Sequence, residues 1–275
     1  MSATGQAEGR EALAWRVLGA VGAPVRRGAQ VMLAAAALML GIVLEAAHRA
    51  TWRRVTVRAE FARELRLALL GGLLTVLVTG AIVGLAMVYQ AISWLSYVGQ
   101  EGLVGRILVT VLVRETTPVL VGLILLGRSG TVTVVEFGSI KASGQLRALE
   151  AQGIDPFVLL VLPRVLALAV AGFTLGMVFL AVSLATGWLA AEIAGLGGSD
   201  PAGLVEQLVG ATDRRDYALF AAKLTLIGAL VALTSAITGM SATARDTPSY
   251  LLPRAFVRGI LAVLLTSGLL TVAVT

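Results

Sequence analysis

Long apolar stretches separated by short charged segments fill most of this chain. The clearest is Leu67–Tyr89, whose 23 residues carry no charge and could cross, as a helix, the roughly 30 Å hydrocarbon core of a bilayer. A second surrounds Arg128, and three more follow it: Val165–Ala191, Leu224–Ala244 and Gly259–Thr275. The pattern predicts an all-α, polytopic membrane protein with five transmembrane helices.

The segment before Leu67 has a different pattern. Val31–Leu44 is apolar for only 14 residues before a basic run begins, a length that favours a helix in the membrane interface. In that run, Val57, Phe61 and Leu65 recur at helical spacing between arginines, as on a helix among the headgroups, and a positively charged flank of the first span explains the run equally well. We expect a polar cytoplasmic N-terminus without a cleaved signal peptide at 1–27, interfacial helices at 28–66 and a membrane-spanning domain at 67–275.

Charge distribution along the chain predicts its orientation. Basic residues gather in 49–66, 136–164 and 245–258, while the connection Glu192–Asp216 carries five acids against two arginines. Because Lys and Arg are enriched in cytoplasmic loops, we expect the N-terminus inside and the C-terminus outside. Composition agrees with a membrane protein, since 57% of residues are hydrophobic and the mean hydropathy is +0.90, outside the soluble range. The net charge of +6 therefore reflects topology and does not argue for nucleic acid.

Several kinds of chemistry lack the residues they need. The chain contains no cysteine and a single histidine, His48, so disulfides and thiolate metal sites are excluded and imidazole metal sites are disfavoured. No phosphate loop of the form G-x-x-x-x-G-K-[ST] is present, because GRSGT lacks both its spacing and its lysine. The second half does not repeat the first, which weakens an inverted-repeat transporter interpretation. Any ATP-derived energy would have to come from a separate chain.

Charged residues inside the second apolar segment are its unusual feature. Arg114, Glu115, Arg128 and Glu136 all lie there, with Pro118 between them. An uncompensated charge at the bilayer centre costs about 2.5–3.5 kcal/mol, so such residues usually face protein, a cavity or a partner. One interpretation is a polar face on a transport path or subunit interface. The other is that Arg128 and Glu136 only extend toward the headgroups at the cytoplasmic end.

The loop that follows contains a short predicted helix, Gln145–Gln152. Gly153 can end this helix in a left-handed cap, and Pro156 prevents its continuation. The result would be a rigid cytoplasmic element between two spans. Such an element suits a membrane domain that an external motor pushes, but an ordinary solvated connection has the same pattern.

Three successive stretches of this region carry a family resemblance. They read RETTPVLVGLILLGRSG, EFGSIKASGQLRALEAQGIDP and LPRVLA. In order and spacing they are similar to the signature of the MlaE/YrbE permease family, the membrane subunits of MCE-type ABC transporters of lipids. Weaker similarity extends over roughly 50–275. The matching residues are Arg114, Glu115, Pro118, Val119, Leu120, Gly127, Arg128, Gly130, Glu136, Gly138, Lys141, Gln145, Ala148, Leu149, Gly153, Asp155, Pro156, Pro163 and Arg164, with Asp216, Lys223 and Arg254 in the weaker part.

The resemblance implies a homodimer in the bacterial inner membrane, each copy with an N-terminal elbow helix and five spans. Its implied partners are a cytoplasmic ABC ATPase, which would hold ATP and Mg, and a periplasmic MCE-domain protein, with phospholipid or a related lipid as substrate. This chain would have no catalytic residue, cofactor or metal of its own. The implied polar transport positions are Arg114, Glu115, Pro118, Arg128 and Glu136. The implied positions for coupling to the ATPase, in a helix within 139–156, are Lys141, Gln145, Leu149, Glu150, Gly153, Asp155 and Pro156.

The sequence departs from the family pattern at a few positions. Val135, Ile140 and Arg147 stand where the family usually has alanine, methionine and an acid, which leaves the subfamily and the lipid open. Three other classes of function were weighed. They are an ATP-independent channel or ion-coupled transporter using Arg128 and Glu136, a membrane scaffold, and an intramembrane hydrolase, for which no serine has a suitable partner.

Overall fold

The computed structural model describes residue 37, residues 39–42, 44–45, 55–99, 103–195, 201–242 and 248–274. The chain forms two compact units, Met1–Arg49 and Ala50–Thr275. Most of the expected polar N-terminus and interfacial region, 1–54, lies outside the described residues. The fold given below is that of the second unit.

Every regular element of the described part is helical. Short π-helical segments, labelled η, interrupt or precede several of the α-helices. In chain order the elements are α3 (Val55–Val83), η1 (Gly84–Val88), α4 (Tyr89–Tyr97), α5 (Val104–Leu108), η3 (Val109–Thr116), α6 (Thr117–Leu125), η4 (Leu126–Gly130), α7 (Thr131–Ala142), α8 (Gln145–Ala151), η5 (Phe157–Val161), α9 (Leu162–Ile193), α10 (Pro201–Ala211), α11 (Arg214–Met240) and α12 (Pro248–Val274).

Five helical stretches of the described residues are long and apolar enough to cross a membrane. This confirms the predicted all-α fold with five candidate spans. The stretches are Val55–Tyr97, Val104–Ala142, Phe157–Ile193, Arg214–Met240 and Leu251–Ala273.

Two elements differ from the sequence-based expectation. From Val55 onward, the basic run before Leu67 is part of α3, the same helix that forms the first span. Val57 is buried there. The connection Glu192–Asp216 contains the helix α10, which packs against α5. Hydropathy alone missed both features, since the charges of the basic run are partly paired within the protein and α10 is too short to span.

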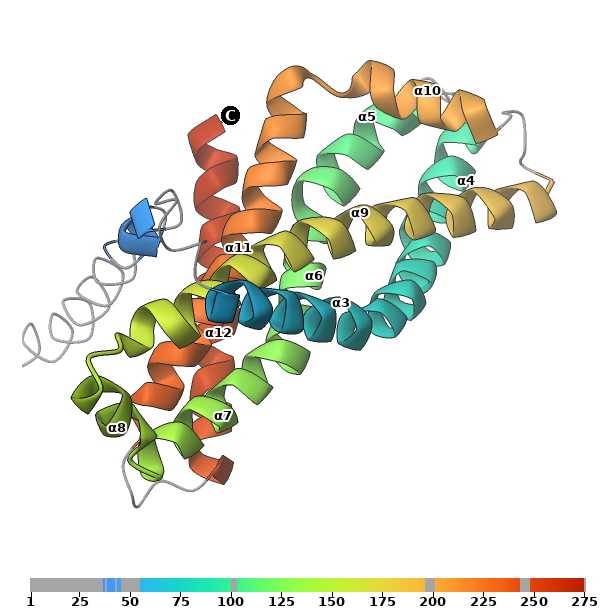
Figure 1. Cartoon of the computed structure of the whole chain (residues 1–275). Helices are drawn as coiled ribbons and strands as arrows, with labels where there is room; N and C mark the ends of the chain where they lie inside the picture. The colour runs from blue at the N-terminus through green and yellow to red at the C-terminus, as the bar shows by residue number, and fades with distance from the viewer. Residues whose placement is uncertain are drawn as a thin grey trace, which may run out of the picture. The chain divides into compact units, whose positions relative to one another are not determined.

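The spans pack so that α8 lies at one end of the bundle and α4, α5 and α10 lie at the other (Figure 1). The helix α9 packs along α3 on one side and against α11 on another, and α11 also contacts α7 and α12. At the α8 end, Val134, Ala242, Leu251 and Ala255 form a small apolar core between α7, α11 and α12. This apolar core therefore holds the ends of α7, α11 and α12 together.

Close approach between α9 and α11 depends on glycines. A Cβ added to Gly228 would lie 2.2 Å from the carbonyl oxygen of Leu168, and one added to Gly172 would lie 2.7 Å from the carbonyl oxygen of Leu224. In a membrane, where the hydrophobic effect does not drive helices together, such small residues allow the van der Waals contact that does. The two backbones thus touch directly.

The second span is irregular near Pro118 and around Gly127 and Gly130. Its helix widens to π geometry at Val109–Thr116, just before Pro118, and again at Leu126–Gly130. Pro118 occupies the first turn of α6, where its missing N–H is tolerated. Such π-helical turns commonly mark functional sites.

A bulkier residue at Gly228 should loosen the bundle. We expect Gly228→Ala to destabilise the protein by about 1–3 kcal/mol, because the new methyl group meets backbone atoms that cannot rotate away. The measurement is the apparent melting temperature in mild detergent. Gly268→Ala in α12 is the matched control, since a Cβ there meets nothing within 4 Å. Equal melting temperatures for the two variants would contradict the packing argument.

Candidate polar sites in the spans

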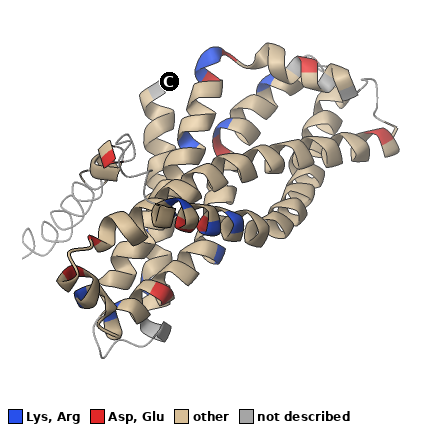
Figure 2. Ribbon diagram, in the orientation of Figure 1, with Lys and Arg blue, Asp and Glu red and all other residues tan. Residues whose placement is uncertain are grey.

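Charged residues are scattered along the bundle (Figure 2), but the ion pairs with a buried partner fall in two regions. One group lies on α3, α7 and α9 and is centred on Arg164; the other lies on η3, α11 and α12 and is centred on Lys223. We call them the Arg164 cluster (Glu64, Glu136 and Arg164) and the Lys223 cluster (Arg114, Glu115, Asp216, Lys223 and Thr271).

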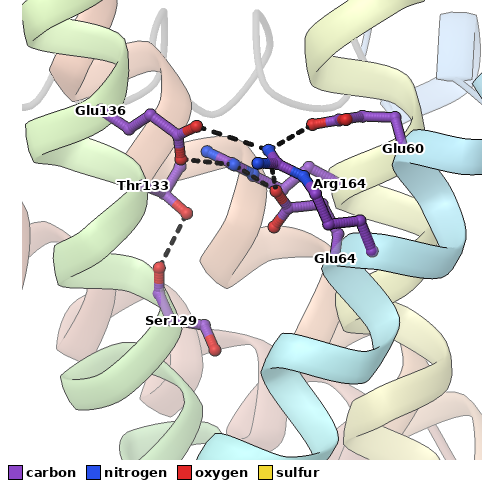
Figure 3. A network of polar contacts seen from close by, with 7 residues as sticks. Glu60, Glu64, Ser129, Thr133, Glu136 and Arg164 are labelled. Carbon is purple, nitrogen blue, oxygen red and sulfur yellow. Dashed lines mark hydrogen bonds and ion pairs between the residues drawn. The ribbon is translucent and has the colours of Figure 1, made fainter. Parts of the chain in front are cut away.

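The Arg164 cluster joins three helices through one guanidinium group (Figure 3). Nη2 of Arg164, near the start of α9, lies 2.5 Å from Oε1 of Glu64 on α3 and 2.6 Å from Oε2 of Glu136 on α7. The Arg164 side chain is only 5% exposed and that of Glu64 9%. The guanidinium also lies over the ring of Phe137, 5.2 Å from its centroid, within the range of a cation–π contact.

A more exposed ion pair borders this cluster. Nη2 of Arg63 lies 2.6 Å from Glu60, 3.1 Å from Glu64 and 3.5 Å from Glu136. Half of the Arg63 side chain is exposed, so these contacts are worth much less than those of Arg164. Below them, the hydroxyl of Thr133 donates to the carbonyl of Ser129 within the same helix (Figure 3).

The Lys223 cluster surrounds an ammonium group that is completely buried. Nζ of Lys223 donates to the carbonyl oxygen of Arg114 at 2.6 Å, to Oε1 of Glu115 at 2.9 Å and to the hydroxyl of Thr271 at 2.5 Å. The Glu115 carboxylate also accepts hydrogen bonds from Thr271 and Ser267. Helices η3, α11 and α12 meet here.

A second ion pair ties η3 to the beginning of α11. Nη2 of Arg114 lies 2.7 Å from Oδ1 of Asp216, whose side chain is 3% exposed. Asp216 is also the N3 residue of a capping box whose N-cap residue is Asp213. Its Oδ2 therefore accepts the Asp213 backbone N–H at 3.2 Å. One carboxylate thus caps a helix and neutralises an arginine.

The two clusters lie at different depths. Glu115 and Glu136 are 21 residues apart in one largely helical span, which corresponds to about 30 Å along the axis. That is close to the thickness of the hydrocarbon core. The polar groups therefore bracket the apolar part of the span, with one cluster on the side of α8 and the other on the side of α10.

Arg128 joins neither cluster in the part of the chain that the structure describes. Its side chain is exposed, and a Cβ added to Gly71 of α3 would lie 3.4 Å from Nη2 of Arg128. It lies eight residues from Glu136, about 12 Å deeper in the membrane. Whereas Glu136 faces protein, Arg128 lies on the outer surface of the single chain.

The predicted coupling residues lie at the α8 end and are mostly exposed. The helix α8 buries none of its residues, Gly153 has φ +73° as a left-handed cap requires, and Oδ1 of Asp155 accepts the Phe157 N–H at 2.9 Å. Lys141 instead donates to the carbonyl of Met240 at the end of α11. Of the remaining positions, Gln145, Glu150 and Arg254 are exposed, Leu149 and Pro156 are half-buried, and Pro118 is buried.

Sequence reasoning missed several members of the two clusters. Glu64 was placed only within a basic run, and Ser267 and Thr271 only within an apolar span. One signal for Glu64 exists in the sequence, because it shares a helical stripe with the buried residues Ala68, Gly72 and Val76. Ser267 and Thr271 lie on a comparable stripe of α12, with the buried residues Ala255, Gly259 and Val263.

The chemistry available at both clusters is ion pairing and hydrogen bonding. No group of three or more metal-ligating side chains occurs among the described residues. The arrangement holds helices in register and offers polar surface at two depths of a membrane bundle.

Comparison with known proteins agrees with this architecture. Residues 61–273 match the model of the Permease MlaE family. The chain belongs to this family of multi-pass membrane permeases.

Three relatives show shorter regions of similarity. The intermembrane phospholipid transport system permease protein MlaE of Haemophilus influenzae is 30% identical over 41% of this chain and 43% of its own length. A probable ABC transporter permease protein of Synechocystis is 35% identical over 33% of this chain and 35% of its own. The Arabidopsis thaliana protein TRIGALACTOSYLDIACYLGLYCEROL 1, chloroplastic, is 32% identical over 37% and 31%. Each match spans less than half of the relative.

Removing only the counter-charge of the buried Lys223 should be worse than removing both charges. We expect Glu115→Gln to destabilise the protein by about 2 kcal/mol, because a fully buried ammonium loses its counter-charge. Adding Lys223→Met removes the stranded charge and should restore part of the loss. The measurement is the melting temperature of both variants in the same detergent. A double variant that melts below Glu115→Gln would show that the pair is not the stabilising element.

Proposed function

We propose that this chain is the membrane subunit of an ATP-driven ABC transporter that moves phospholipid or a related lipid. Two copies would assemble in the inner membrane with a cytoplasmic ABC ATPase and a periplasmic MCE-domain protein, and ATP with Mg would be bound by the ATPase. The observation that carries the proposal is the match to the Permease MlaE family over most of the five spans. The names of the Haemophilus and Synechocystis relatives support it.

Exposure of α8 supports the partnership with an ATPase. This helix and its flanking turns project from the end of the bundle (Figure 1) and bury no residue of their own. Its exposed residues include Gln145, Arg147 and Glu150, which suit a polar groove on a partner. A short helix with glycine caps at Gly144 and Gly153 transmits displacement better than a flexible loop.

The exposed Arg128 supports the assembly of two copies. A guanidinium group on the outer surface of a span requires a polar or anionic partner, because solvation by lipid tails is poor. A second copy of the permease, or a lipid held at the interface between copies, would supply that partner. This agrees with the polar transport role expected for the residue.

Purification from native membranes tests the whole proposal. The tagged permease is isolated in mild detergent, and co-eluting proteins and bound lipids are identified by mass spectrometry. We expect an ABC ATPase, an MCE-domain protein and a phospholipid. A permease that elutes alone, and moves solute across liposomes without ATP, would refute the proposal in favour of a channel or ion-coupled transporter.

A charge reversal on α8 tests the docking surface. We expect Glu150→Lys to reduce the co-purified ATPase about tenfold, because a like-charge contact in an interface costs several kcal/mol. The measurement is the ratio of ATPase to permease after affinity purification. Glu206→Lys is the matched control, since Glu206 is equally exposed but lies on α10 at the other end of the bundle. Undiminished recovery with Glu150→Lys would remove α8 from the interface.

A further inference from the structure

The Arg164 cluster closes a loop in the chain that begins and ends at α8. The helix α7 leads into α8, and η5 with α9 leads out of it. Glu136 lies six residues before the end of α7, and Arg164 is the third residue of α9. Their contact therefore joins the two arms on which α8 is mounted.

Glu64 extends this connection to α3, a helix that is not adjacent to α8 along the chain. The helix α3 contacts η4 and η5 and packs along α9, and its carboxylate at Glu64 shares Nη2 of Arg164 with Glu136. The three side chains converge from α3, α7 and α9 (Figure 3). A displacement of α7 and α9 is thus passed to α3 mainly through the buried guanidinium group of Arg164, with the more exposed Arg63 of α3 as a second contact to Glu136.

Irregular helical segments border both arms that carry α8. The π-helical segment η4 lies before α7, and η5 lies between α8 and α9. Segments of this kind interrupt the regular α-helical hydrogen-bond pattern. The helices α7 and α9 both pack against α11, and the Arg164 cluster adds a direct polar link between them.

We propose that the Arg164 cluster is the mechanical connection through which α8 moves α3, α7 and α9 as one body. Glu64 and Arg164 are then positioning residues for transport: they contact neither lipid nor nucleotide. This inference rests on the proposed ATP-driven function for its role in transport, while the rigidity of the cluster is a property of the permease alone.

Buried charge makes the cluster suitable for this role. Arg164 and Glu64 are almost completely shielded from solvent, so their attraction is weakly screened. Both carboxylates contact the same nitrogen, Nη2, so Glu64 and Glu136 are held to one side-chain atom. The exposed pair of Arg63 and Glu60 on the same helix lacks this shielding and contributes little.

The first test separates coupling from stability. The permease is reconstituted with its ATPase and MCE-domain partner in liposomes, and ATP hydrolysed and fluorescent phospholipid transferred are measured together. We expect Glu64→Gln to lower the lipid transferred per ATP hydrolysed about tenfold, while ATPase binding is retained. Loss of folded protein would lower both rates together and leave their ratio unchanged.

Glu60→Gln is the matched control for that test. It makes the same substitution one turn earlier on α3, in the exposed pair, and should keep the ratio within about twofold of the wild type. Arg164→Lys provides a second variant that preserves the charge but removes the planar guanidinium that lies over Phe137 and reaches both carboxylates. A ratio unchanged in both Glu64→Gln and Arg164→Lys would overturn the proposal.

The second test needs only the permease. The chain has no cysteine, so spin labels can be attached through Ala59→Cys on α3 and Ser139→Cys on α7, both at exposed positions. In nanodiscs we expect one narrow distance distribution for the wild type and for Glu60→Gln. In Glu64→Gln the narrow distribution should be lost. Identical distributions in all three proteins would refute the rigid connection.

The two tests also distinguish failure of this inference from failure of the proposed function. A wild-type permease that binds no ATPase or transfers no lipid refutes the proposed function before any variant is compared. The distance measurement then still decides whether Glu64 holds α3 to α7 and α9. A rigid cluster in a wild-type complex that transports, with an unaltered ratio in the variants, would refute only the coupling role.

Discussion

The requirement that every charge in a membrane-spanning helix find a partner shapes this protein. Arg164, Lys223 and Asp216 are nearly or fully buried, and each contacts an opposite charge on another helix. Desolvating such groups is expensive, so each contact fixes which helices meet and at what height. Apart from Arg128, the segments between the clusters carry few charges, and they pack mainly by shape. Polar contacts therefore determine the register of the bundle at its two ends.

Close backbone contact between helices holds the middle of the bundle, between the two polar clusters. Between the two ends, α9 approaches α3 and α11 at glycines, among them Gly72, Gly172 and Gly228. Since lipid tails are as apolar as leucine, dispersion contact and fixed polar pairs are the main forces that can hold these helices together. A bundle held in this way can be firm at its ends while its exposed leucine surface faces lipid. That combination suits a protein whose ends must pass motion across the membrane.

The sequence predicted the five spans and the α8 helix because both depend on local rules. Backbone groups in lipid must pair within a helix, so long apolar runs are helices almost by necessity, and Gly153 with Pro156 ends α8 by local geometry. The inner partners were harder to predict. Whether Glu60 or Glu64 turns inward depends on helix phase against α9, and Thr271 became a ligand of Lys223 only through packing of α12. Arg128 illustrates the same difficulty, because its exposure depends on which helices cover it.

Residue type at the two cluster centres follows from geometry. Lys223 carries three N–H donors on a compact ammonium, and it has three acceptors in different directions: a backbone carbonyl, a carboxylate and a hydroxyl. Arg164 instead contacts two carboxylates from different helices through Nη2, and its guanidinium lies over the Phe137 ring, a contact that suits a planar, delocalised cation. Exchanging lysine and arginine between the two positions would keep the positive charge but would lose the directions of the hydrogen bonds. Positive charge alone is therefore insufficient at either position, and the arrangement of donors is what connects the helices.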